Sequence, residues 1–239
     1  MDTVLQGAEA RVATLNGGRP FFRAQVAHHD EHDEEAGATI PGPAFPDRMT
    51  PFSDRASEGR VNPKGIPCLY LGSDRHTALA ECRPWIGSLV TISVFRTVRD
   101  LKIVDCTRNA HKSFFYFDRE PSPKKREEAV WSHIARAFRE PVTRDDNRAD
   151  YAPTQVVAES FRAAGFDGVA YRSAFGTDKF NLALFDLGAA SLQMSELHEV
   201  KDIHFAHDQA ANPYFVKERD EGKKQIVRNV MVEVRPLKG

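Results

Sequence analysis

The chain has 239 residues, enough to bury the core of one large domain or of two small ones. Its hydrophobic fraction of 41% and charged fraction of 28% are typical of a soluble globular protein. Because 33 Lys and Arg oppose 34 Asp and Glu, no overall electrostatic field favours nucleic acid or an anionic membrane as a partner.

The start of the chain and its cysteines predict a cytoplasmic protein. Asp2, Glu9 and Arg11 interrupt the first apolar residues, so the continuous apolar stretch of a signal peptide is missing. No later apolar run approaches the length that spans a bilayer. The odd number of cysteines, without C-x-x-C spacing, favours neither a disulfide framework nor a zinc knuckle. These residues are Cys68, Cys82 and Cys106. Each lies among apolar residues, as a free thiol in a reducing cytoplasm does.

Residues 28–51 are rich in Asp, Glu, His, Pro and Gly, and we expect them to form a long surface loop or insertion. Within this stretch, residues 28–33 read His-His-Asp-Glu-His-Asp, and such side chains are able to ligate a metal. Because no helix fixes their geometry, we interpret them as a solvated acidic loop and expect no metal site.

A strand followed by a helix is predicted between residues 66 and 84. The short apolar run 66–71 indicates a buried strand. The helix is expected over 76–82, with Ser73 or Asp74 as its N-cap. Pro84 ends it, since the residue before a proline avoids the helical region.

Two more strands are predicted before residue 105. From 90 to 95 apolar residues alternate with others, which is strand periodicity, and Thr91 and Ser93 are expected on a polar outer face. Residues 101–104 form a second, shorter strand candidate.

The clearest helix spans about 124–139, where Trp131 lies on an apolar stripe and Ser122 suits the N-cap. Another helix, about 154–164, ends at Gly165, a residue suited to the position after a helix. Further strands are expected at 168–171, 182–185, 200–205 and 226–234. Strands thus outnumber helices, and few of them are joined through a helix, so a doubly wound parallel sheet is not expected. The predicted fold class is α+β.

Polar residues concentrate beside buried ones in three segments. These are 59–65, which leads into the strand carrying Tyr70, 77–81 in the last turn of the next helix, and 167–173 with 181–185 close behind.

In these segments the sequence resembles the RES domain, a family named for an arginine, a glutamate and a serine. The resemblance covers about 21–185 and is specific, because several spaced motifs recur in the family's order. Its motifs are Gly59-Arg60 to Asn62-Pro63, Leu69-Tyr70-Leu71, Thr77-Ala78-Leu79-Ala80-Glu81 with Arg83-Pro84, then 151–159, 165–173 and 181–185, with Phe22-Arg23-Ala24 as the opening.

The resemblance implies a fold similar to that of ADP-ribosyltransferase toxins, with split antiparallel or mixed β-sheets and flanking helices. It implies one domain over 1–239, with a core at about 21–190 and C-terminal strands of open role at 191–239. Characterised members of the family consume NAD, so NAD is expected as the substrate. They also stand beside an antitoxin that occupies the pocket, which implies such a partner here. A homo-oligomer is left open, and neither nucleic acid nor membrane is expected.

The residues themselves suit cleavage of the nicotinamide–ribose bond of NAD. Loss of nicotinamide leaves an oxocarbenium-like ribose, and the carboxylate of Glu81 would stabilise that charge. Tyr70 offers a flat face for nicotinamide and a polar tip. Arg60 and Arg23 are suited to bidentate contacts with the pyrophosphate.

Two supporting residues complete the candidate site. Ser173 has no adjacent base to activate it, so it is assigned to positioning the ribose or holding Glu81. Asn62 is expected to brace the loop that carries Arg60. Taken singly, each site residue also has an ordinary structural explanation, such as an exposed helix carboxylate or a turn-forming serine.

The sequence therefore predicts an NAD-consuming toxin or defence effector that acts by glycohydrolysis or phosphorolysis. An ADP-ribosyltransferase would use the same site chemistry, with the 28–47 insertion as its candidate acceptor loop. A third hypothesis is a non-catalytic NAD-binding or partner-docking module, for which a carboxylate at residue 81 would have no use.

Overall fold

The structure is a computed structural model. It describes residues 2–35, 37–52, 54–108, 120–140, 148–176, 178–209, 214–219 and 223–228. The chain divides into two compact units, Met1–Lys201 and Asp202–Gly239. No helix in the described ranges is long and apolar enough to cross a membrane.

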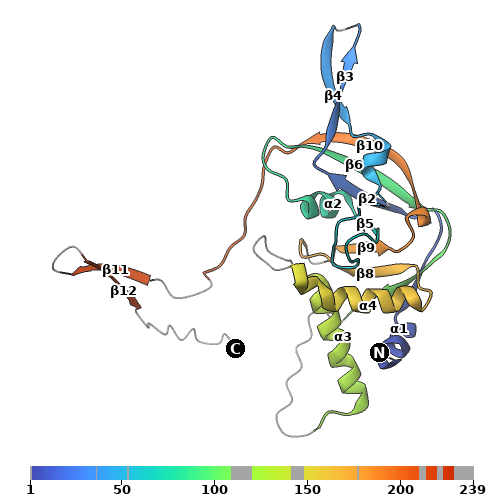
Figure 1. The fold of residues 1–239 in the computed structure, drawn as a ribbon, viewed down its shortest axis with the longest axis vertical. Helices are drawn as coiled ribbons and strands as arrows, with labels where there is room; N and C mark the ends of the chain where they lie inside the picture. Colours follow the sequence, from blue (N-terminus) through green and yellow to red (C-terminus); the bar gives the residue numbers. More distant parts are fainter. Residues whose placement is uncertain are drawn as a thin grey trace. The chain divides into compact units, whose positions relative to one another are not determined.

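An eight-stranded mixed sheet organises the first unit, in the order β1-β7-β8-β9-β5-β2-β6-β10 (Figure 1). Its strands are β1 Val12–Leu15, β2 Pro20–Gln25, β5 Leu69–Gly72, β6 Leu89–Thr97, β7 Leu101–Asp105, β8 Gly168–Arg172, β9 Phe180–Leu184 and β10 Ala190–Glu199. Each neighbouring pair runs antiparallel except β7 and β8. The predicted α+β class, with a mixed sheet and flanking helices, is confirmed.

The sheet is joined at its middle by one register pair, Phe22 of β2 with Gly72 of β5. Helix α2, Arg75–Cys82, packs against β2, β5 and β6 beside this joint. A Cβ at Gly72 would lie 2.8 Å from the backbone nitrogen of Ala78, so only glycine lets the helix start this close to the strand. The joint and α2 together form the framework of the site described below.

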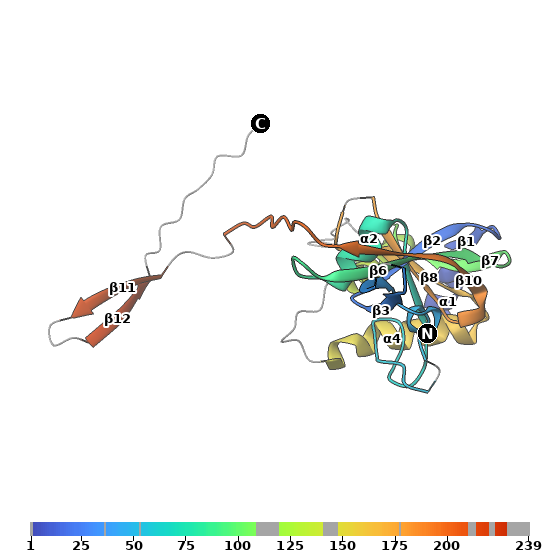
Figure 2. The same cartoon turned by 90° about the horizontal axis from the view of Figure 1, so that it is seen from above.

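Three helices gather beside β7 and β8: α1 Asp2–Glu9, α3 Pro123–Arg139 and α4 Ala152–Ala163. Figure 2 shows α4 and α2 on opposite sides of the strands. Trp131 and Phe138 of α3 and Phe161 of α4 are fully buried in the core that these helices make with the sheet. Each helix packs here by turning its apolar stripe toward this face of the sheet.

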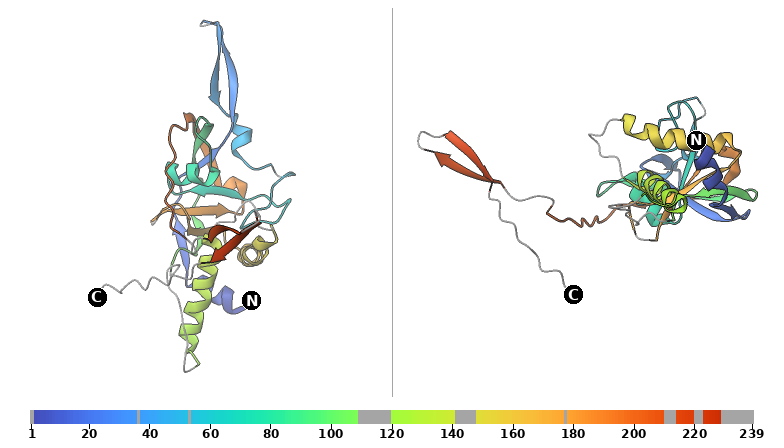
Figure 3. Two further views of the ribbon diagram at one scale, coloured as in Figure 1. Left: turned by 90° about the vertical axis from the view of Figure 1, so that its left-hand side faces the viewer. Right: turned by 90° about the horizontal axis from the view of Figure 1, so that it is seen from below.

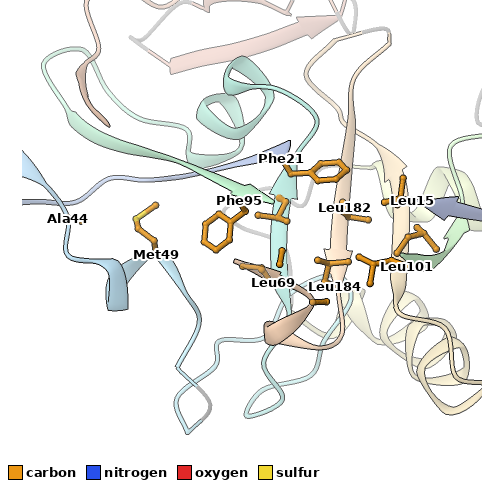
Figure 4. Close-up of a cluster of buried hydrophobic side chains, with 13 residues drawn as sticks. Leu15, Phe21, Ala44, Met49, Leu69, Phe95, Leu101, Leu182 and Leu184 are labelled. Atoms are coloured by element: carbon orange, nitrogen blue, oxygen red, sulfur yellow. The ribbon is translucent and has the colours of Figure 1, made fainter. Parts of the chain in front are cut away.

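A second hydrophobic core lies on the other face of the sheet (Figure 4). Leu182 and Leu184 of β9 point into it, whereas Ala183 between them belongs to the helix-side core. Successive strand residues face opposite sides, so residues 182–184 of β9 are all apolar because both faces of the strand are covered there. The labelled members of this core come from β1, β2, β5, β6, β7, β9 and the segment around Met49.

The helix boundaries follow the predicted signals closely. Asp74, one of the two N-cap candidates, accepts a hydrogen bond from the Thr77 backbone nitrogen at 2.9 Å. Helix α2 ends at Arg83, which adopts a left-handed conformation (φ 47°) directly before Pro84. Gly165 follows α4 with φ 82°, as expected for a residue after a helix.

The prediction of a long loop over 28–51 is wrong. Strands β3 His28–Asp33 and β4 Ala38–Pro43 pair as a hairpin, followed by a 3-10 turn at Pro46–Met49. Figure 3 shows this hairpin extending from the first unit. Strand β3 carries polar side chains on both faces and β4 contains two prolines and a glycine, so no hydrophobic alternation was there to indicate them.

The prediction that Thr91 and Ser93 lie on a polar outer face of β6 is also wrong, because both side chains are fully buried. The Thr91 hydroxyl donates to the carbonyl of Ala27 at 2.6 Å and accepts from the Ala44 backbone nitrogen at 2.8 Å. The Ser93 hydroxyl lies 2.7 Å from that of Ser195. These hydroxyls are buried because each finds a hydrogen-bond partner.

The expected strand at 200–205 is wrong as well, since the last strand of the sheet is β10, which ends at Glu199. In the second unit β11 Tyr214–Arg219 pairs with β12 Lys223–Arg228. The predicted strand at 226–234 overlaps the end of β12, and its remaining residues lie outside the described ranges.

Candidate functional site

A cavity of about 290 Å³ lies at the joint of the sheet, where it is lined by both Phe22 and Gly72. Residues from β2, β5, α2, β8 and β9 contribute to its wall. Four predicted site residues line it together: Arg23, Arg60, Tyr70 and Glu81. The other two predicted residues, Ser173 and Asn62, are buried and each bonds directly to one of these four.

The Glu81 carboxylate is hydrogen-bonded through only one of its two oxygens. Its Oε1 accepts hydrogen bonds from Ser173 Oγ at 3.0 Å and from Asn181 Nδ2 at 2.6 Å. Among the described residues, none bonds to Oε2, and the side chain is exposed to solvent at the cavity. The donors fix the orientation of the carboxylate while leaving one charged oxygen accessible to a ligand.

Tyr70 is tied into the fold by its hydroxyl. That group donates to Asn62 Oδ1 at 2.6 Å and accepts from the Val61 backbone nitrogen at 3.0 Å. Burial raises the pKa of Tyr70 well above its usual value, so the phenol stays protonated. The hydroxyl thus has a structural partner on each side, and the ring is the part of Tyr70 left for a ligand.

Asn62 braces the loop before β5. Its Nδ2 donates to the carbonyl of Ser57 at 2.9 Å and to that of Ile66 at 2.7 Å. Thr154 of α4 adds a hydroxyl bond to the carbonyl of Arg60 at 2.7 Å. The backbone that carries Arg60 is therefore fixed from both sides.

The guanidinium of Arg60 lies at the C-terminal end of α3. Its Nη1 donates to the carbonyl of Phe138, and its Nη2 donates to that of Glu140 at 2.5 Å. Carbonyls in the last turn of a helix lack partners within the helix, and a cation there also interacts favourably with the helix dipole. Arg60 is thus an anchor for α3 as well as a wall of the cavity.

Arg23 differs from Arg60 because part of its hydrogen-bonding capacity is unused. Its Nη1 donates to the carbonyl of Tyr70 at 3.1 Å. Its Nε is buried and has no partner within the part of the chain that the structure describes. Desolvation by burial lowers the pKa of Arg23. A buried cationic donor without a partner favours an anionic ligand.

Cys82 also lines the cavity, but its environment disfavours a thiolate. Burial raises the pKa of Cys82 to about 11, although Arg23 opposes the shift. Its Sγ donates to the carbonyl of Ala24 at 2.9 Å. The thiol therefore stays protonated at neutral pH. Among the described side chains, no group of three or more His, Cys, Asp and Glu could hold a metal ion.

Sequence reasoning had assigned no role to three residues of the cavity wall, Asn181, Tyr151 and Tyr171. Asn181 could have been found as a polar residue that opens an otherwise apolar strand run, 181–185. The two tyrosines gave no such signal: Tyr171 reaches the wall because β8 pairs with β9 and sets it opposite Asn181, and Tyr151 does so from the residue before α4.

A sequence model described as the RES domain matches residues 38–208. No curated protein gives a significant match. Among solved structures, the crystal structure of the M. tuberculosis MbcT-MbcA toxin-antitoxin complex is similar at 15% identity and a TM-score of 0.46. That likeness covers 83% of this chain and 93% of the other.

Proposed function

Because this chain belongs to the RES domain family, we propose that it cleaves the nicotinamide–ribose bond of NAD and acts as a toxin or defence effector. One observation carries the proposal: the exposed Glu81 carboxylate lines the cavity, is held through Oε1 by Ser173 and Asn181, and has no partner at Oε2 among the described residues. A fixed anion at a cavity with cationic walls suits a substrate with a positive reacting centre and negative phosphates.

In the proposed reaction, the bond between the ribose anomeric carbon and the nicotinamide nitrogen breaks first. The nitrogen keeps the bonding electron pair, so nicotinamide leaves as a neutral molecule and the positive charge passes to the ribose. Glu81 stabilises this charge. Water then adds to the anomeric carbon and releases a proton, giving ADP-ribose. Inorganic phosphate attacking in place of water would give the phosphorylated product.

The neighbours of Glu81 have defined tasks in this mechanism. Ser173 and Asn181 keep the carboxylate in one orientation, so no reorganisation is needed as charge develops. The ring of Tyr70 provides a flat surface for nicotinamide. Arg23 supplies donors for the pyrophosphate.

The direct test is to incubate the purified full chain with NAD and to measure free nicotinamide by liquid chromatography. We expect one nicotinamide for each ADP-ribose formed. ADP-ribose found attached to protein would indicate transfer, and a phosphorylated product formed only in phosphate buffer would indicate phosphorolysis. Intact NAD after prolonged incubation would refute the proposed activity.

The two arginines can be separated by lysine substitutions. Arg23→Lys should weaken NAD binding by about tenfold, because a point charge replaces a fork of donors. Arg60→Lys should differ from Arg23→Lys by lowering the unfolding temperature, since contacts of the guanidinium with two carbonyls at the end of α3 are lost. Affinity is best measured by calorimetry in a Glu81→Gln background, where NAD is not consumed.

Arg126→Lys is the control for both variants, because Arg126 is exposed and pairs with Glu120 on the surface. Unchanged NAD affinity in Arg23→Lys, with a large loss in Arg60→Lys, would move the pyrophosphate contact from Arg23 to Arg60.

We also propose a protein partner whose terminal segment enters the cavity, as an antitoxin would. A carboxylate on that segment would meet Arg23 and Arg60 at the cavity wall. Such a partner should raise the apparent KM for NAD without lowering the maximal rate. Co-purification from the native host followed by a competition assay tests this. A partner that binds while NAD still enters the cavity freely would rule out the plug.

A further inference from the structure

A second cavity, of about 400 Å³, adjoins the first one, because Arg23 and Tyr70 line both. Much of its wall comes from the segment that follows the β3–β4 hairpin. That segment contributes Arg48, Phe52 and Arg55. Nothing in the proposed chemistry at Glu81 makes use of these three side chains.

The second cavity has a cationic wall. Arg23, Arg48 and Arg55 line it together with the carboxylate of Glu58, and Arg55 Nε also pairs with the exposed Asp54 at 3.2 Å. Gln25 lies between two of these arginines: with its amide oriented to satisfy both neighbours, its oxygen accepts from Arg23 Nη2 at 3.0 Å and its nitrogen donates to the carbonyl of Arg48 at 2.7 Å. The buried Nε of Arg23 remains without a partner among the described residues. Donors gathered in this way are suited to phosphate oxygens.

The size of the first cavity also indicates that a dinucleotide needs a second binding region. At 290 Å³ it lies just below the range of roughly 300–1,000 Å³ that pockets for drug-sized ligands occupy. A dinucleotide whose nicotinamide ribose lies at Glu81 would therefore extend beyond this cavity, and the wall shared at Arg23 and Tyr70 offers one direction. The space beyond Arg23 and Tyr70 is the second cavity.

We propose that the second cavity binds the adenosine diphosphate half of the substrate. Its phosphates lie at Arg23, Arg48 and Arg55, and its base lies against the exposed ring of Phe52, over which the Arg55 guanidinium carbon sits 5.5 Å from the centroid. The identity of the ligand rests on the proposed function, whereas the preference for a nucleoside diphosphate follows from the wall of the cavity itself.

The test is calorimetric binding of ADP and of adenosine to the full chain, without NAD. ADP should bind at least about tenfold more tightly than adenosine, because charged hydrogen bonds to phosphate are missing for the nucleoside. The double variant Arg48→Ala/Arg55→Ala should lose about tenfold or more in ADP affinity. Arg126→Ala is the matched control, and Glu81→Gln should bind ADP as the wild-type chain does.

Arg48 and Arg55 are both exposed, so the double variant should unfold at the wild-type temperature, and Arg48→Lys/Arg55→Lys should restore part of the affinity. Equal ADP affinity in the double variant and the wild type would overturn the proposal, as would equal affinity for ADP and adenosine. ADP binding that needs these arginines, without any nicotinamide release, would refute the proposed reaction and keep the site. Nicotinamide release together with ADP binding that does not depend on Arg48 and Arg55 would refute the second binding site and keep the proposed reaction.

Discussion

Replacing Glu81 by Gln should lower the turnover of NAD by on the order of 10²–10³, because the charge that stabilises the ribosyl cation is removed. The side chain keeps its size, and the amide oxygen of Gln can still accept from Ser173 and Asn181. NAD affinity and the unfolding temperature should therefore change little. Single-turnover release of nicotinamide and calorimetric binding of NAD measure the two effects separately.

The matched control is Glu9→Gln, which neutralises an exposed carboxylate on α1. It should release nicotinamide at the wild-type rate. If Glu81→Gln also did so, Glu81 would not be the catalytic carboxylate. A loss of turnover accompanied by an equal loss of NAD affinity would instead place Glu81 in substrate binding.

Production of the chain in a bacterial host should deplete NAD and arrest growth. The reason is chemical, since a glycohydrolase destroys the cofactor, whereas a dehydrogenase returns it. Growth curves and enzymatic measurement of the total NAD and NADH pool after induction test this expectation. The pool should fall before growth slows if depletion is the cause.

Cells that produce Glu81→Gln should grow normally, and cells that produce Glu9→Gln should arrest like those with the wild-type chain. Equal amounts of the three proteins must be verified by blotting. Arrest with an unchanged NAD pool would contradict cofactor depletion and would indicate modification of a cellular target.

Much of the cavity wall could be predicted from the sequence because its residues belong to motifs that are local in the chain. Arg60, Tyr70 and Glu81 lie within one loop–strand–helix unit, so their proximity needs only the correct assignment of β5 and α2. The N-cap of α2 and the proline after it mark that helix clearly.

The contacts that could not be predicted depend on distant packing. The bond of Asn181 to Glu81 requires β9 to pair with β5, and this pairing follows from the sheet order rather than from any local pattern. The position of Arg60 at the end of α3 likewise depends on how that helix docks on β8. Periodicity reports which face of an element is buried, but it does not report the partner element.

The strand errors have a similar cause. Thr91 and Ser93 read as a solvated face because their hydroxyls are polar, yet each is buried with a hydrogen-bond partner. The β3–β4 hairpin has the opposite problem, since β3 carries polar residues on both faces and is held by backbone pairing with β4. In both cases side-chain polarity was a poor guide to whether the backbone is extended.

The double role of Arg60 couples ligand binding to the folding of α3. Its guanidinium cannot give the same N–H groups both to the carbonyls of Phe138 and Glu140 and to a phosphate. A ligand that takes these donors must loosen the last turn of the helix. By thermodynamic reciprocity, anything that frays this turn must strengthen binding of that ligand by the same free energy. If the substrate phosphates bind Arg60, the end of α3 competes with them for the same donors.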